Sequence, residues 1–274
     1  MVVPEDVAIA LEAGNFAVVR HWLTSGARDA NDVDSNGFTL LQRTLVPHQA
    51  HMPPCACMGP SRVEMMRLLI EHGAEVSHTP NGIEPIFYCA CAEEVRVLLD
   101  AGGDVNVQLS APNGPGLTPL MYYLQFAPTF PAMVDFAKFL VKCGADLSLT
   151  SFLGDAETLV RRTCEHMQRF QMQTEEHNLE VPHFLAEMDL AASRHLADWL
   201  ADVRRAGGYA KFVREPRVAL ARLRLLCERG RASPPDGGAT KEDRALERLF
   251  GPRTPLPRGV FWLVVQYWRS DRDV

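Results

Sequence analysis

The stretch Leu140-Val141-Lys142-Cys143-Gly144-Ala145 has three near copies earlier in this 274-residue chain. Each copy closes an apolar segment and precedes a polar turn. The copies are Trp22-Leu23-Thr24-Ser25-Gly26-Ala27, Leu69-Ile70-Glu71-His72-Gly73-Ala74 and Leu98-Leu99-Asp100-Ala101-Gly102-Gly103. Recurrence at intervals of a few tens of residues indicates stacked units, which bury their apolar faces only against one another.

The glycine of each copy marks the expected end of a helix. Before it, apolar residues recur at helical spacing, as in Phe136, Phe139 and Leu140. Glycine adopts the left-handed conformation that ends a helix without a steric penalty from a Cβ atom. The start of a helix is clearest at Thr118, which can cap free backbone amides, and at Pro119, which suits the first helical position. Each unit is therefore predicted to contain helices joined by polar turns.

These residues resemble ankyrin repeats, most closely in Gly116 to Met121 with Phe139 to Asp146, and in Leu98 to Asn106. The histidine that the family places after Thr-Pro-Leu is replaced by Met121 in the best copy. The resemblance implies an all-α solenoid of paired helices with protruding turns, followed by a C-terminal helical region. We expect four repeats over residues 1–153, with an insertion at 46–61, and a capping unit that begins near Thr150.

The resemblance also implies that the concave side of the solenoid binds a protein partner, so that the chain is an interaction module or adaptor without catalysis. The partner-binding residues that it indicates are Asp34, Asn36, Asn106, Gln108, Tyr122, Tyr123 and Gln125. Tyrosine is a common interface anchor. Because adjacent helical residues point about 100° apart, at most one of Tyr122 and Tyr123 is expected to reach a partner, and the other belongs to the core.

The second half of the chain is predicted to be helical over 154–230, with a linker at 231–254 and an apolar helix at 255–274. One helix is expected to begin near Pro182, and another to begin at Pro216. Although the net charge is −6, residues 204–231 carry nine basic and two acidic side chains. Few aromatic residues interleave these charges, which favours a solvated helix face, or a surface for the acidic repeats, over a nucleic-acid site.

The C-terminal part has a second resemblance, to the suppressor-of-cytokine-signalling box and to the F-box. The residues that fit the order of these motifs are Leu223, Cys227, Leu256, Pro257 and Tyr267. This implies an alternative function, a substrate receptor that recruits a cullin-type ubiquitin ligase and its components. The simpler alternative is that Phe261, Trp262, Val265 and Trp268 pack back on the helical half as a closing element, because apolar aromatic residues at helical spacing usually indicate burial.

A possible metal site lies in the insertion, where two imidazoles and two thiols could complete a tetrahedral zinc shell. Its candidate ligands are His48, His51, Cys55 and Cys57. The Cys-x-Cys spacing is tighter than in usual zinc sites, so we expect neither a metal nor another cofactor. No phosphate-binding glycine loop or nucleophile elbow occurs in the sequence, which gives no support for an enzyme.

The cellular compartment is predicted from three absences. The seven cysteines form no recognisable disulfide framework, the N-terminus lacks the features of a signal peptide, and no apolar run is long enough to cross a bilayer. We therefore expect an intracellular protein, cytoplasmic or nuclear, without a membrane partner.

Overall fold

The computed structural model describes residues 2–25, 29–46, 60–111, 114–176, 189–229, 260, 261 and 265. They fall into two compact units, Met1–Ala201 and Asp202–Val274. The helices of the first unit are α1 (Glu5–Glu12), α2 (Phe16–Thr24), α3 (Leu40–Leu45), α4 (Pro60–Glu71), the 3-10 helix η1 (Pro85–Tyr88), α5 (Ala92–Asp100), α6 (Pro119–Leu124), α7 (Ala132–Lys142) and α8 (Ala156–Glu176). Helix α10 (Leu190–Ala206) begins in this unit.

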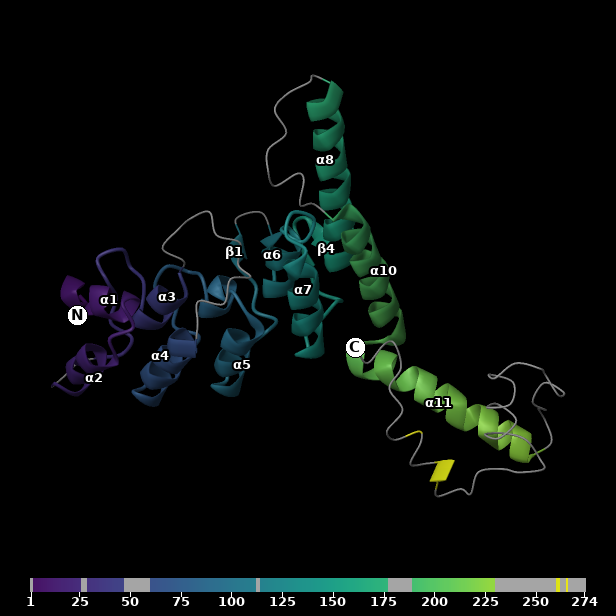
Figure 1. Cartoon of the computed structure of the whole chain (residues 1–274), viewed down its shortest axis with the longest axis horizontal. Coiled ribbons are helices and arrows are strands. Elements are labelled where there is room, and N and C mark those ends of the chain that lie inside the picture. Colours follow the sequence, from purple (N-terminus) through teal and green to yellow (C-terminus); the bar gives the residue numbers. More distant parts are fainter. Residues whose placement is uncertain are drawn as a thin grey trace. The chain divides into compact units, whose positions relative to one another are not determined.

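These helices form two layers of a stack that follows the chain (Figure 1). In the first layer, α1 contacts α3, α3 contacts η1, η1 contacts α6, and α6 contacts α8. In the second layer, α4 contacts α5 and α5 contacts α7, while α1, α3 and α6 each contact the helix that follows them. The stack confirms the predicted all-α repeat solenoid.

The glycines of the repeated stretch end their helices as predicted. Gly73, Gly102 and Gly144 have φ angles of 92°, 91° and 102°. At the last of them, the amide of Gly144 donates to the carbonyl of Val141 and the amide of Ala145 to that of Leu140, both at 3.1 Å. This pairing satisfies carbonyls that the helix end leaves free. The glycine of the first copy lies outside the described residues.

A second repeated feature joins two of the turns to the unit that follows each of them. The side chain of Asn31 donates to the carbonyl of Gly73 at 3.1 Å and accepts from the amide of Glu75 at 2.7 Å. Two repeats later, the side chain of Asn106 likewise donates to the carbonyl of Gly144 at 3.2 Å and accepts from the amide of Asp146 at 2.7 Å. Identical bonds at both positions show that the units are structurally equivalent, whatever their length.

The turns include two small hairpins. β1 (Ser110–Ala111) pairs antiparallel with β2 (Gly114–Pro115), and β3 (Thr150–Ser151) with β4 (Gly154–Asp155). The amide of Phe152 joins them by donating to the carbonyl of Pro115 at 3.0 Å. The hairpin at 150–155 leads into α8, and the capping unit expected to begin there stays a prediction. Helix α10 is tied to α8 by the ion pair between Arg161 and Asp198 at 2.7 Å.

Within the compact unit Met1–Ala201, a buried ion pair fixes the second repeat to the third. Arg62 on α4 lies 3.1 Å from the carboxylate of Glu94 on α5, whose side chain is 1% exposed. Arg62 also donates to the carbonyl of Leu45, and Glu94 accepts from the amide of Ala90 at 2.6 Å. Desolvation raises the pKa of Glu94, although Arg62 and the backbone amides of Ala90 and Cys91 oppose the shift. These bonds hold the segment that follows η1.

The sequence predicts the starts of two later helices, at Pro182 and Pro216. The expected start near Pro182 lies outside the described residues and stays a prediction, and α10 is described from Leu190 onward. The start at Pro216 is wrong, because α11 (Tyr209–Glu228) contains this proline in its interior. Gly208, with a φ of 110°, precedes the helix, so one glycine pair both ends α10 and allows α11 to begin.

In the compact unit Asp202–Val274, Phe261 and Val265 are buried and pack with Leu220 and Cys227 of α11. The guanidinium of Arg224 lies over the Phe261 ring, 4.5 Å from its centroid. This confirms the packing predicted for Phe261 and Val265, whereas Trp262 and Trp268 lie outside the described residues. Across the part of the chain that the structure describes, no helix combines the length and the apolar character needed to span a membrane.

Candidate functional site

Three side chains occupy the same position in successive units. Arg43, Tyr88 and Tyr122 each lie four residues after the N-cap of their helix, which is Thr39, Glu84 or Thr118. We call these three residues the inner-helix row. All three are partly exposed, whereas the residues on either side of Tyr122 are buried. The row is therefore the edge along which the first layer of helices reaches solvent.

Aromatic rings surround the two tyrosines of the row. Phe38 packs edge-on against Tyr88, with ring centroids 6.1 Å apart. Tyr122 makes edge contacts with Phe87 at 5.7 Å and with Phe126 at 5.6 Å. These distances are typical of favourable aromatic pairs, each contributing about 0.5–1.5 kcal/mol beyond burial of their area. The rings are thus held in place before any partner arrives.

Tyr122 and Tyr123 differ in burial, as expected for adjacent residues of a helix. Tyr123 is 1% exposed, and its hydroxyl lies 2.9 Å from the carbonyl of Ile86 and 2.7 Å from that of Cys89. Desolvation raises its pKa well above the ordinary value. Tyr123 is a core residue that anchors η1, and its place among the surface candidates is corrected. Tyr122 keeps a partly exposed ring.

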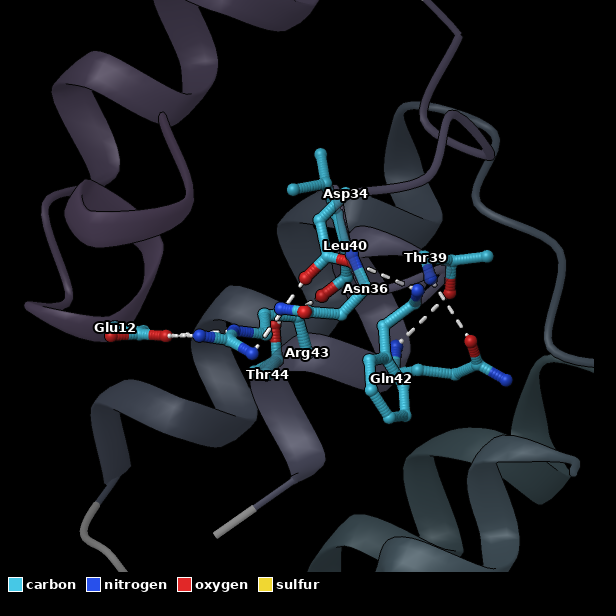
Figure 2. Close-up of polar contacts among 9 residues, drawn as sticks. Glu12, Asp34, Asn36, Thr39, Leu40, Gln42, Arg43 and Thr44 are labelled. Atoms are coloured by element: carbon cyan, nitrogen blue, oxygen red, sulfur yellow. Dashed lines mark hydrogen bonds and ion pairs between the residues drawn. The ribbon is translucent and has the colours of Figure 1, made fainter. Parts of the chain in front are cut away.

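Arg43, the first residue of the row, is already paired within the chain (Figure 2). Its guanidinium bonds to the carboxylate of Glu12, with Nε 2.7 Å from the acceptor oxygen. A second nitrogen lies 3.7 Å from Asp34, whose side chain is 6% exposed. At this end of the row, the protein therefore supplies both the acidic groups and the cation that balances them.

The opposite holds at the tyrosine end of the row. Glu84 occupies the N-cap position of η1, but its side chain makes no capping hydrogen bond. Desolvation raises its pKa, and the nearby charge of Asp104 raises it further. Within the first unit, neither carboxylate has a described Lys, Arg or His within ion-pair distance. Two acidic groups without a cation from this unit thus lie in the turns that precede η1 and follow α5.

Most of the other predicted surface residues support the turns. Asp34 is buried and accepts from the amides of Asn36 and Phe38 at 2.8 and 2.9 Å, so its role as a contact residue is corrected. Gln108 donates to the carbonyls of Gly116 at 3.2 Å and Thr150 at 3.0 Å. Gln125 donates to the carbonyl of Tyr122 at 3.3 Å.

Two of these candidates differ in exposure and role. Asn36 is exposed, while Asn106 is partly buried and makes the bonds to the following unit described above. Among the seven predicted residues, Asn36 and Tyr122 therefore remain those whose side chains are free to meet a partner on the grounds of burial and bonding. Their binding role stays a prediction.

Sequence reasoning missed Tyr88, Phe38 and Glu84. The third unit has a four-residue 3-10 helix in place of its first α-helix, which obscured the match to the repeat pattern. Counting four residues from the N-cap would have found Tyr88, because the same count gives Tyr122 from Thr118. No sequence signal brings Glu84 and Asp104 together, since they come from different turns.

The described residues contain no group of three His, Cys, Asp or Glu side chains that could hold a metal ion. The candidate zinc ligands His48, His51, Cys55 and Cys57 lie outside the described residues. Burial raises the pKa of the Cys89 thiol well above its ordinary value, which keeps this thiol protonated and unreactive at neutral pH. A cavity of about 140 Å³ lies where α1 and α3 end and α4 begins, with Glu12, Arg43 and Arg62 in its wall.

Only part of the predicted ubiquitin-ligase box is described. Leu223 is 40% exposed on α11, and Cys227 packs against Phe261 and Val265. Leu256, Pro257 and Tyr267 lie outside the described residues. A groove of about 480 Å³ runs along the same helix, lined by Lys211, Arg214, Glu215, Val218, Ala219 and Arg222. The box itself stays a prediction.

Comparison with known proteins finds similarities to solved structures. No family model matches the chain. No curated protein matches it either. A solved structure described as the ankyrin repeat domain of Bcl-3, a unique member of the IkappaB protein family, is 16% identical, with a TM-score of 0.35. The similarity covers 60% of this chain and 87% of that one. Within this chain, the turns that contain Asn31 and Asn106 are equivalent because both side chains make the same hydrogen bonds to the unit that follows.

Proposed function

We propose that the chain is a protein-interaction module that binds its partner along the inner-helix row, without catalysis. The observation that carries this proposal is the group of aromatic side chains Phe38, Tyr88, Tyr122 and Phe126. Each is partly exposed, and edge-to-face contacts with neighbouring rings fix its orientation. Rigid aromatic residues lose little entropy on binding and dominate the energetics of many interfaces.

The surrounding structure suits this role. Tyr88 lies on η1 and Tyr122 on α6, whose start is capped by Thr118. The side chains of Asn31 and Asn106 join their turns to the units that follow. A binding surface placed on such a scaffold needs little rearrangement when a partner arrives, which lowers the entropic cost of association. The described residues around the row offer contact area and hydrogen bonds.

The test uses the purified full chain and a display library of short random peptides. Selected peptides are labelled, and their dissociation constants are measured by fluorescence anisotropy for three proteins: wild type, Tyr122→Ala and Phe152→Ala. Phe152 is the control because it is 54% exposed but lies on a hairpin outside the row. Tyr122→Ala is expected to weaken binding by about tenfold or more, and Phe152→Ala to change it little. Equal affinity for wild type and Tyr122→Ala would contradict the proposal.

A second variant protects this test against misfolding. Tyr122→Phe keeps the ring contacts and removes only the hydroxyl, so it is expected to fold as the wild type does. If Tyr122→Ala loses binding, the circular dichroism spectrum and the thermal unfolding midpoint must match those of Tyr122→Phe for the loss to be assigned to the surface.

A further inference from the structure

A series of hydrogen bonds leads from the start of α3 to the hydroxyl of Tyr88. The backbone amide of Thr39 donates to Oε1 of Gln42 at 3.0 Å (Figure 2). Nε2 of Gln42 donates to Oδ1 of Asn81 at 2.9 Å and to the carbonyl of Ile83 at 2.6 Å. Nδ2 of Asn81 lies 3.4 Å from the hydroxyl oxygen of Tyr88. We call Gln42, Asn81 and Tyr88 the amide relay, because two side-chain amides connect one repeat to the row position of the next.

Backbone groups fix the direction of each bond in the amide relay. The amide of Thr39 can only donate, so the Gln42 atom that faces it is the oxygen, and the nitrogen faces Asn81. The amide of Ile83 donates to Oδ1 of Asn81 at 3.2 Å, which identifies that atom as an oxygen in the same way. Gln42 is 0% exposed, so reversal of its amide would leave buried groups unpaired. Nδ2 of Asn81 therefore donates to Tyr88.

The hydroxyl of Tyr88 is left with a proton to donate. Its oxygen accepts from Asn81, and among the described residues none accepts a hydrogen bond from it. Desolvation raises the pKa of Tyr88, the bond from Asn81 lowers it and Tyr122 raises it, so the hydroxyl keeps its proton at neutral pH. Hydrogen bonds in series polarise one another, which makes this hydroxyl a better donor. Phe38 holds the ring, so the proton is offered from a fixed position.

The neighbouring tyrosines show why this proton is available to a partner. The hydroxyl of Tyr123 is buried and donates toward two backbone carbonyls, at 2.9 and 2.7 Å. No carbonyl of the described chain approaches the hydroxyl of Tyr88 in this way, and Tyr88 is partly exposed. The Tyr122 ring contacts that of Phe87, the residue before Tyr88, at 5.7 Å. One partner segment can therefore reach both tyrosines of the row.

We infer that Tyr88 determines specificity on the row by donating a hydrogen bond to a carbonyl or carboxylate oxygen of the partner, and that Asn81 gives this bond its direction. This inference rests on the proposed function of the row. A partner that places an oxygen at Tyr88 replaces the water that the hydroxyl loses on binding. A partner that places an apolar group or a donor there leaves the hydroxyl unpaired, which lowers its affinity. Asn81 is a positioning residue, because it acts through Tyr88.

The test uses those selected peptides whose binding depends on Tyr122. Tyr88→Phe removes the donor and keeps the ring, and we expect the dissociation constant to rise roughly fivefold. Asn81→Asp keeps the shape of the side chain and still accepts from Gln42 and Ile83, but it presents an oxygen to Tyr88 in place of the amide nitrogen. The hydroxyl then donates inward, and we expect a similar loss of roughly fivefold.

The double variant separates this reversal from the negative charge that Asn81→Asp adds. If Asn81 acts through the hydroxyl, Asn81→Asp changes affinity by less than about twofold in the Tyr88→Phe background. Equal losses from Asn81→Asp in both backgrounds would assign the effect to charge and overturn the inference. Circular dichroism and thermal unfolding of all three variants show whether the fold is retained. Tyr88→Phe, which keeps every ring contact, decides the result if an Asn81 variant unfolds.

The possible results also separate the inference from the proposed function. If binding depends on Tyr122 but no peptide is weakened by Tyr88→Phe, the inference is overturned and the interaction surface stands. If no selected peptide depends on Tyr122, the proposed function itself fails, and the inference with it. Alanine substitutions in the peptide identify the acceptor. A side-chain oxygen is the acceptor where its removal costs less affinity in Tyr88→Phe than in wild type, and a main-chain carbonyl is the acceptor where every removal costs the same in both.

Discussion

Both ends of the inner-helix row have acidic side chains in the adjoining turns, but only one end has an arginine of its own, Arg43, that pairs with them. At the Arg43 end, acidic side chains are held by a cation from the same chain, and they stabilise the junction of the first two units. At the Tyr88 and Tyr122 end, desolvation and the nearby charge of Asp104 raise the pKa of Glu84, and no described cation of the same unit pairs with either carboxylate. The paired carboxylates therefore stabilise the fold, whereas the unpaired carboxylates lie at the end of the row that we propose as the binding surface.

The largest expected effect concerns the most buried of the paired carboxylates. Arg62→Ala leaves Glu94 charged and buried without its partner, so we expect the free energy of unfolding to fall by about 3–5 kcal/mol. Urea denaturation measures this change. The control is Arg96→Ala, which breaks an exposed pair with Glu93 and is expected to cost less than about 1 kcal/mol. Equal losses for both variants would show that burial does not distinguish these pairs.

The adjacent tyrosines give the next effect. Tyr123→Phe removes the hydroxyl that bonds to the buried carbonyls of Ile86 and Cys89, and we expect a loss of about 1–3 kcal/mol in unfolding free energy. Tyr122→Phe removes a partly exposed hydroxyl and is expected to change stability by less than about 0.5 kcal/mol. Thermal and urea unfolding of the two variants should therefore separate clearly. A larger loss for Tyr122→Phe would reverse the assignment of core and surface.

A smaller loss is expected at the paired end of the row. Arg43→Gln removes the cation from Glu12 and Asp34, so the free energy of unfolding should fall by about 1 kcal/mol, in keeping with a partly exposed charge-assisted bond. Urea denaturation at low and at moderate salt measures it, and the difference from wild type should shrink as salt rises. A variant as stable as wild type would mean that the two ends of the row do not differ in this respect.

The smallest effect is expected at the unpaired end. Glu84→Gln removes one of two like charges and a carboxylate whose pKa is raised by desolvation and by Asp104. Because the folded protein disfavours the charged form, stability at neutral pH should stay within about 0.5 kcal/mol of wild type or rise slightly. Equilibrium unfolding at pH 7 measures it. A clear loss of stability would reveal an internal partner for Glu84 and remove the contrast with Asp34.

Local rules predicted the units better than the contacts between them. The helix ends at Gly73, Gly102 and Gly144 and the start at Thr118 follow from backbone sterics and capping, which act within a few residues. Pro216 misled, because a proline that suits a first turn can also be accommodated within a helix that begins earlier, at Tyr209.

Only part of the candidate site could be predicted from the sequence. Helical geometry stated that one of Tyr122 and Tyr123 is buried, but only the hydroxyl contacts with Ile86 and Cys89 decide which one. The approach of Glu84 to Asp104 joins two turns 20 residues apart in the numbering (84 and 104), and depends on how neighbouring units stack. Stacking geometry is set by tertiary packing, which no short sequence pattern encodes.

Hydrogen–deuterium exchange of the full chain, with and without a saturating selected peptide, tests most directly whether the two ends of the row differ in function. We expect slower exchange for amides in residues 82–90 and 117–126, which contain η1 and α6, and unchanged exchange in residues 40–45, which form α3 around Arg43. Protection confined to residues 40–45, or to the outer helices α4 and α7, would contradict the assignment of the Tyr88 and Tyr122 end as the binding surface.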